Sequence, residues 1–160
     1  MNRPTPQTAS AAGPSREASD RALEALGAVY ADLDALLATL PVACQACGRC
    51  CDFVRNDYRL YASLIERLPV LRFAGPPRLT AAGHCGFLAG GRCSVHRWRP
   101  LSCRVFFCAP EHKAREQELY HAFQQRLRAA TDRLGLEWDY APFFAGQAGG
   151  PAGGQNSVLP

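Results

Sequence analysis

Residues 44–51 read CQACGRCC and place four thiols within one short stretch of chain. Four more cysteines follow at wider spacing, namely Cys85, Cys93, Cys103 and Cys108. Eight cysteines are many more than a core of this size uses as small apolar side chains. Disulfides, metal ligation or redox chemistry must therefore account for them, and the compartment in which the protein works decides which.

The sequence shows no sign of export. The N-terminal residues contain no apolar signal-peptide core, and Asp32 and Asp34 interrupt the stretch from Leu23 to Leu40, so neither a signal peptide nor a transmembrane helix is predicted. We therefore expect a cytoplasmic protein without a membrane partner, in a compartment that keeps thiols reduced. Adjacent Cys50 and Cys51 also argue against disulfides, because neighbouring cysteines bridge each other only in strained geometry. A disulfide scaffold remains as an alternative.

The length and composition predict one domain with two tails. A chain of 160 residues with 48% hydrophobic and 20% charged residues is ordinary for a globular protein. Residues 1–17 are rich in Pro, Ser, Thr and Ala, and residues 145–160 are rich in Gly and Pro. Both segments are predicted to be disordered tails. The domain is therefore expected to span residues 18–144.

Three amphipathic helices are predicted around the cysteines. Apolar residues recur at steps of three and four from Ser19 to Leu40, and Pro41 is placed to end that helix. A second helix is expected from about residue 57 to residue 68, with Pro69 ending it, and a third from Pro110 to about Leu134. The buried stripe of the third helix is predicted to consist of Leu119, Phe123, Leu127, Ala130 and Leu134.

The middle of the chain is predicted to be irregular. Prolines and glycines between residues 71 and 110 permit only short strands or turns, and Gly90 and Gly91 are placed to close a small hairpin. All eight cysteines lie outside the predicted helices. The sequence therefore predicts a single small domain that is mainly α with an irregular, cysteine-rich, metal-binding middle, that is, a small α+β fold.

The spacing of the first cysteines is typical of a metal loop. Two residues separate Cys44 from Cys47 and Cys47 from Cys50, so a tight turn can aim the sulfurs at one point while backbone N–H groups donate to them. Iron–sulfur ferredoxins place three thiolate ligands on one loop and a fourth at a distance in the sequence, which is the spacing seen here. Zinc ribbons instead carry a second close pair about a dozen residues on, which is missing here. Spacing favours iron–sulfur by a small margin, and zinc stays open because four thiolates accept either.

Positive charge accompanies the cysteines. Between Cys44 and Cys108 the chain has ten arginines and three acidic residues. A four-thiolate site that holds zinc or a 2+ cluster carries a charge of about −2, so bound centres would offset much of this excess. The arginines are therefore interpreted as donors to sulfurs and nearby carbonyls. They are scattered and not interleaved with aromatic residues, which argues against nucleic acid as a partner.

Four blocks of sequence together match the pattern of a known family. They are CQACGRCC at residues 44–51, CGFL at 85–88, GRCSV at 91–95 and RPLSCR at 99–104. The chain resembles the YkgJ-type CxxCxxCC cysteine-cluster family, also called the putative zinc- or iron-chelating domain, over residues 44–108. The resemblance implies metal chelation by the cysteines, in a family whose members are often labelled iron–sulfur proteins. A flagellin lysine methylase carries a related motif, which implies that the module also serves enzymes.

The cluster and the resemblance together give a set of expected metal ligands. The set consists of Cys44, Cys47, Cys50, Cys51, Cys85, Cys93, Cys103 and Cys108. His96 stands where the family usually has an aromatic residue such as Tyr, so whether it adds a ligand stays open. Cys108 and His112 are one helical turn apart, which leaves the same question for His112. The sequence fixes neither the number of metal sites nor the pairing of ligands.

Several residues near the cysteines have predicted supporting roles. Arg99 is interpreted as a guanidinium anchored beside thiolates, next to a turn that Pro100 opens and that delivers Cys103. Asp57 fits either an acceptor near the metal or the N-cap of the second helix. The aromatic residues expected to cover the cysteines are Trp98, Phe106 and Phe107.

The predicted function is chelation of an iron–sulfur cluster or related iron centre, with a redox or accessory role. The alternative is a structural zinc module that presents its helices to an unknown protein partner. No Ser/His/Asp arrangement, phosphate loop or carboxylate pair stands out, so hydrolysis and nucleotide chemistry lack support, and no enzymatic activity is assigned. The sequence identifies no substrate, redox partner or oligomeric state.

Overall fold

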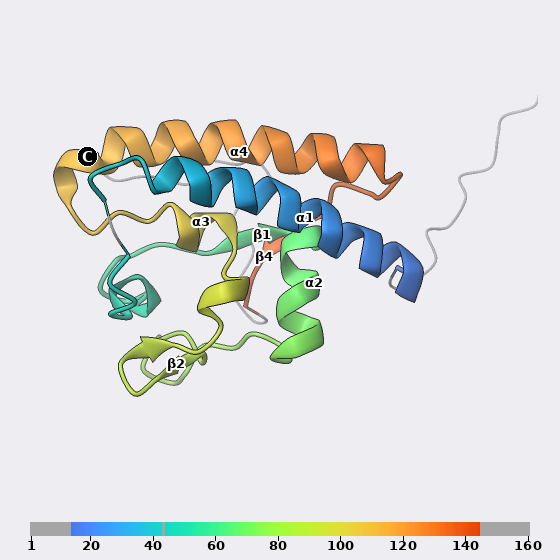
Figure 1. Cartoon of the computed structure of the whole chain (residues 1–160). Coiled ribbons are helices and arrows are strands. Elements are labelled where there is room, and N and C mark those ends of the chain that lie inside the picture. Colours follow the sequence, from blue (N-terminus) through green and yellow to red (C-terminus); the bar gives the residue numbers. More distant parts are fainter. Residues whose placement is uncertain (1–13, 43, 145–160) are drawn as a thin grey trace, which may run out of the picture.

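Two long helices cross the molecule side by side in the computed structural model, which describes residues 14–42 and 44–144 (Figure 1). They are α1 (Arg16–Leu37) and α4 (Lys113–Arg133), and they run in opposite directions. Helix α2 (Leu64–Phe73) packs against α1, and the one-turn helix α3 (Leu101–Arg104) lies below α4. No helix of the described residues is both long enough and apolar enough to cross a membrane.

Helix α1 confirms the first predicted helix but with shifted ends. Ser15, rather than Ser19, caps the helix, because its Oγ accepts a hydrogen bond from the Ala18 N–H at 3.2 Å. Arg16 and Glu17, which were assigned to the N-terminal tail, are therefore helical. The helix ends at Leu37, ahead of the position predicted from Pro41.

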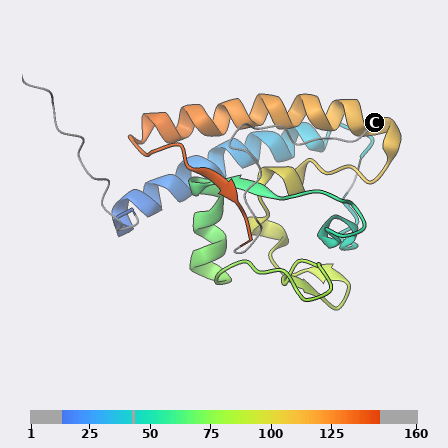
Figure 2. The ribbon, with the colours of Figure 1, turned by 180° about the vertical axis from the view of Figure 1, so that it is seen from behind.

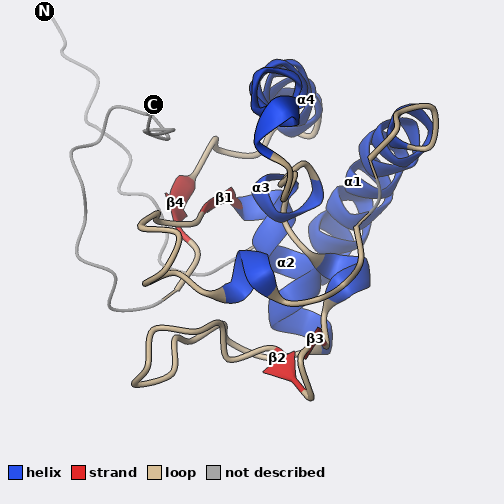
Figure 3. Cartoon of the chain, turned by 90° about the vertical axis from the view of Figure 1, so that its left-hand side faces the viewer, coloured by secondary structure: helices blue, strands red, loops and turns tan. Residues whose placement is uncertain are grey.

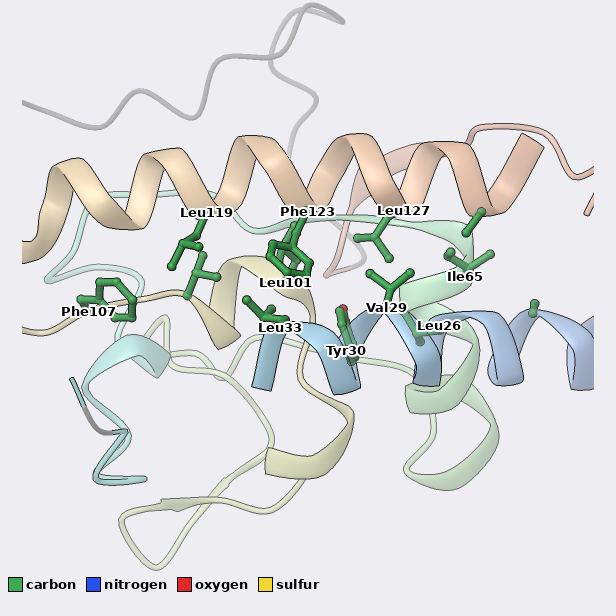
Figure 4. Packing of buried hydrophobic residues seen from close by; sticks show 13 residues of the cluster. Leu26, Val29, Tyr30, Leu33, Ile65, Leu101, Phe107, Leu119, Phe123 and Leu127 are labelled. Atoms are coloured by element: carbon green, nitrogen blue, oxygen red, sulfur yellow. The ribbon is translucent and has the colours of Figure 1, made fainter. Parts of the chain in front are cut away.

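The apolar stripes of α1 and α4 face each other and form the larger of two cores (Figure 4). The predicted stripe of the third helix is confirmed, since Leu119, Phe123, Leu127 and Ala130 are buried and Leu134 packs against them. A short 3₁₀ turn at Pro110–His112 precedes α4. The buried residues of α1 in this core are Ala22, Leu26, Val29, Tyr30 and Leu33.

The second predicted helix was placed too early. Residues 61–63 form strand β1 (Tyr61–Ser63), and α2 starts at Leu64, where Ser63 and Glu66 form a capping box. Asp57 is therefore not an N-cap; it lies in a turn with a φ of +44°. Pro69 is buried inside α2 instead of ending it. The capping box therefore sets the start of this helix. The apolar spacing and Pro69, on which the prediction depended, do not set its ends.

Two small antiparallel sheets complete the fold, which is mainly α as predicted. Strand β1 pairs with β4 (Tyr140–Pro142), a strand that the sequence did not indicate, and Figure 2 shows this pair from behind. Strands β2 (Leu88–Ala89) and β3 (Arg92–Cys93) form the predicted hairpin through Gly90 and Gly91. The two glycines have φ values of +56° and +75°, which a residue with a Cβ adopts only with strain.

A second, smaller core includes residues of the irregular loops, which are drawn in tan in Figure 3, where α1 and α4 are seen end-on. Phe53, Leu60, Phe143 and Phe144 are buried in it together with cysteines from separate parts of the chain. Two segments of this core that are far apart in the sequence are joined by a hydrogen bond from the Phe143 N–H to the Leu60 carbonyl, at 2.8 Å. The helical core therefore supports a distinct cysteine-containing core.

One buried carboxylate joins three helices. Glu66 of α2 is 3% exposed and accepts hydrogen bonds from the Tyr30 hydroxyl at 3.0 Å and from the Leu101 N–H at 2.8 Å. Its other oxygen accepts from the N–H and hydroxyl of Ser63, at 2.7 and 2.6 Å. Because Tyr30 belongs to α1 and Leu101 opens α3, this side chain fixes α3, and with it Cys103, relative to the helical core.

Because the Tyr30 hydroxyl is buried, we expect the folded protein to lose stability at alkaline pH. Burial, together with the neighbouring Glu66 charge, raises the pKa of Tyr30 well above its ordinary value of 10.0. The protonated phenol therefore contributes full stability below about pH 10, and the contribution is lost as the pH rises further, by about 1.4 kcal/mol per pH unit. Urea unfolding between pH 9 and about pH 11 measures this slope. Tyr30→Phe is expected to make the slope shallower, and an unchanged slope would contradict the assignment.

Candidate metal centre

All eight cysteines line one chamber of about 510 Å³. They reach it from five places in the fold: the loop before β1, the segment before β2, strand β3, helix α3 and the loop before α4. All eight are free thiols. The fold thus brings together thiols that lie up to 64 residues apart in the sequence, between Cys44 and Cys108.

Four of the thiols form an inner group. The Cys51 thiol lies close enough to the thiols of Cys50, Cys85 and Cys93 to shift their proton affinities. Cys51 and Cys85 are 5% and 7% exposed, so this group belongs to the smaller core. Cys103 packs against the same core, and burial beside the thiols of the inner group raises its pKa. The chain positions Cys51 at the centre of the inner group, a role that its sequence position did not reveal.

The remaining three thiols form an outer group at the surface. Cys44, Cys47 and Cys108 are exposed, although they line the same chamber. Burial raises the pKa of the Cys108 thiol, and the neighbouring Cys47 thiol adds to this effect. The sequence grouped Cys44, Cys47 and Cys50 as one ferredoxin-like triplet, whereas in the structure only Cys50 of the three belongs to the inner group.

The loop that carries the first four cysteines is shaped by two left-handed residues. Ala46 and Gly48 have φ values of +50° and +74°, and the Cys51 N–H then donates to the Gly48 carbonyl at 2.9 Å. The Ala46 N–H donates to the Cys44 Sγ at 3.4 Å, which is the kind of N–H to sulfur contact that the spacing predicted. A hydrogen bond from the Cys85 N–H to the Cys51 carbonyl, at 2.8 Å, fastens this loop to the next one.

Gly48→Ala is expected to destabilise the protein by about 3 kcal/mol, because two costs combine. The first is the left-handed backbone, and the second is a new Cβ that would lie 2.4 Å from the Leu88 Cδ1 and 3.2 Å from the Gly91 carbonyl oxygen. Gly90→Ala is the matched control, since Gly90 has a positive φ but open space around it. Urea unfolding of both variants measures the difference, and equal losses would show that the contact with the hairpin is unimportant.

The inner thiols have unequal proton affinities. The neighbouring Cys51 thiol lowers the pKa of Cys50 to about 7 and that of Cys93 to about 6, and the Arg99 charge lowers both further. The Cys51 thiol also lowers the pKa of Cys85, whereas its own pKa is raised, because the neighbouring thiols and burial favour its protonated form. Thiolates are therefore available in the chamber near neutral pH, and the thiolate is the form that binds metals.

Aromatic side chains cover the chamber. Tyr58 stacks with Phe106 at 6.0 Å between ring centroids, packs against Phe53 at 4.7 Å, and donates its hydroxyl to the Cys50 carbonyl at 2.5 Å. Phe106 and Phe107 line the chamber, as predicted. Trp98 packs against the same core and stacks on Phe73. This cover keeps water from one side of the inner thiols.

Two of the four histidines line the chamber. The His96 Nε2 is 3.3 Å from the Cys44 Sγ, and burial lowers the pKa of His96, so its ring is neutral near neutral pH. His112 is the second lining residue, whereas His84 and His121 do not line the chamber. A neutral imidazole is a chemically suitable fourth donor beside the three thiols of the outer group.

The donor set fits a thiophilic metal. Four thiols gathered around Cys51 are the ligand type of tetrahedral zinc and of iron–sulfur clusters. Among residues 14–42 and 44–144, no group of three or more His, Cys, Asp or Glu side chains is already arranged to hold a metal ion. The thiols therefore surround the chamber without converging on one point, and binding must draw them together, which couples metal binding to local folding.

Comparison with known proteins gives one match. A family model, CxxCxxCC, described as a putative zinc- or iron-chelating domain, matches residues 43–126, just over half of the chain. Neither the curated proteins nor the solved structures gave a match. The matched segment includes all eight cysteines, together with α2, α3 and the first two thirds of α4.

Proposed function

Because this chain belongs to the CxxCxxCC family of putative zinc- or iron-chelating domains, we propose that its chamber holds an iron–sulfur cluster or related iron centre, in a redox or accessory role. The ligands are the inner thiols of Cys50, Cys51, Cys85 and Cys93, with the other four cysteines at hand around the chamber. The observation that carries the proposal is the convergence of eight free thiols on one chamber of about 510 Å³. A reducing compartment such as the cytoplasm suits this chemistry.

The size of the chamber favours a cluster over a single ion. One zinc ion takes four thiolates at about 2.3 Å and closes its site completely. Such a site would use only half of the eight thiols that line the chamber. A cluster of several irons bridged by sulfide needs more room and tolerates more thiolates near it. The aromatic cover and the buried Cys51 and Cys85 would limit access of water, which affects cluster stability and potential.

Anaerobic purification tests the proposal directly. The full chain is expected to be brown, to bleach with dithionite, and to contain iron and acid-labile sulfide in similar amounts. Elemental analysis of the same sample for iron and zinc provides the comparison. A colourless protein with zinc and no sulfide would contradict the iron–sulfur proposal while leaving metal chelation intact.

A structural zinc module is the second candidate, and the inner group favours it. Four thiols linked through Cys51 match the closed four-thiolate site of structural zinc. In this case the domain would present its helices to a protein partner, and the half-exposed Leu71 and Phe73 of α2 provide apolar surface for one. One zinc per chain, together with folding that fails when zinc is withheld, would support this candidate.

A further inference from the structure

Arg99 carries a buried positive charge without a counter-ion. Its side chain lines the chamber and is only 9% exposed. Its Nε is fully buried and has no hydrogen-bond partner. None of the six ion pairs among the described residues includes Arg99. A buried guanidinium without a counter-ion is strongly unfavourable, so something must offset its charge.

Arg104 is a second buried arginine beside the chamber, and its charge is paired within the protein. It is equally buried, at 9% exposure, and also lines the chamber. Its Nη1 pairs with both Asp34 carboxylate oxygens, at 2.8 and 3.0 Å, and its Nε and Nη2 donate to the carbonyls of Arg99 and Arg97. All of its nitrogens therefore have protein partners. Arg99 differs because its Nε has none.

No carboxylate of the described residues pairs with Arg99, because the nearby Asp34 is paired with Arg104. The Arg99 Nη1 contacts the His96 Nε2 and donates to the His96 carbonyl at 3.3 Å. The Arg99 charge lowers the pKa of the Cys50 and Cys93 thiols and opposes the burial that raises the pKa of Cys103. Among the described residues, the thiols of the inner group are therefore the groups whose anionic form Arg99 stabilises.

We propose that Arg99 is a positioning residue for the metal centre: its fixed charge and its unpaired N–H stabilise the net negative charge of a four-thiolate centre. The inference rests on the proposed function but holds for zinc and for an iron–sulfur cluster, since either would give the centre a charge of about −2. The bound centre and Arg99 thus offset each other. Without the centre, the buried charge of Arg99 destabilises the fold.

Arg99→Gln tests the inference, with Arg92→Gln as the matched control. Arg92 is exposed and adjacent to Cys93, so its replacement removes the same charge close to the centre without emptying a buried position. Metal retention of the purified, loaded proteins is measured by titration with EDTA. We expect Arg99→Gln to lose metal at an EDTA concentration about tenfold lower than wild type does, and Arg92→Gln to behave like wild type. Equal retention by all three would overturn the inference.

Two further measurements separate electrostatics from packing. In an iron–sulfur protein, Arg99→Gln should also lower the reduction potential, because the loss of positive charge disfavours the more negative, reduced centre. Unfolding of metal-free protein should show Arg99→Gln as stable as wild type or more so. Lower stability of the variant both with and without metal would mean that Arg99 only fills space, and would overturn the inference.

The outcomes also distinguish this inference from the proposed function. Wild-type protein that purifies without iron or zinc refutes metal chelation itself. Metal-loaded wild type with an indistinguishable Arg99→Gln refutes the role of Arg99 alone. If Arg99→Gln does not fold even with metal present, Arg99→Lys decides: folded protein that retains metal supports the charge, and loss of fold or metal with the charge kept overturns it.

Discussion

Replacement of Cys51 by serine is expected to abolish metal retention and to destabilise the domain by about 4 kcal/mol. Cys51 is the thiol that lies beside those of Cys50, Cys85 and Cys93, and it is 5% exposed. A serine hydroxyl is a poor ligand for zinc or iron–sulfur centres and leaves a smaller, polar group in an apolar core. Elemental analysis and urea unfolding of the same preparation measure both effects.

Cys47→Ser is the matched control for this experiment. It is the same chemical change at an exposed thiol of the outer group. The sequence predicts that it also lowers bound metal, whereas its exposure predicts a smaller loss of folding stability than Cys51→Ser causes. A Cys51→Ser protein that keeps its metal and its unfolding midpoint would show that the inner group is not the binding site.

Replacement of Glu66 by alanine is expected to destabilise the fold by a similar amount, about 4 kcal/mol. The change leaves the Tyr30 hydroxyl, both Ser63 donors and the Leu101 N–H without their acceptor in a buried position. Since Leu101 opens α3, the loss should also release Cys103 and weaken metal retention. Chemical denaturation followed by circular dichroism measures the first effect, and EDTA titration measures the second.

Glu66→Gln is the control, because it keeps the shape and one acceptor oxygen. Its amide NH₂ would face donors, either Ser63 or Tyr30 and Leu101, so roughly half of the loss should remain. If the alanine variant were as stable as wild type, water would have to replace the carboxylate, and the claim that Glu66 fixes α3 would be wrong.

The helical part of the fold could be predicted because it depends on local periodicity. The stripe Leu119, Phe123 and Leu127 repeats at helical spacing, and it is buried as expected. Helix ends were less predictable, since Ser15 and the Ser63–Glu66 pair set them through side-chain hydrogen bonds that several nearby residues could equally have made. Pro69, a strong stop signal, was overridden by that capping and by burial.

The residues of the candidate site could be predicted from the sequence, but their arrangement in space could not. Residue type and spacing identified the eight cysteines, and all line the chamber. Which thiols lie beside one another depends on contacts between distant segments, such as Cys51 with Cys85, and no local pattern encodes these. The same holds for β4, whose pairing with β1 joins residues about 80 positions apart. Arg99 was expected beside the thiolates, but only the structure showed that its Nε has no protein partner.

The pairing of β4 with β1 has a consequence for biosynthesis. Phe143 lines the chamber and Phe144 is buried in the adjoining core, so one wall comes from residues that the ribosome makes after all eight cysteines and after α4. The helices can pack earlier, because α4 ends at Arg133. We therefore expect that metal binding waits until the chain through Phe144 has been made, and that nascent chains arrested before Tyr140 remain metal-free while their helices are already formed.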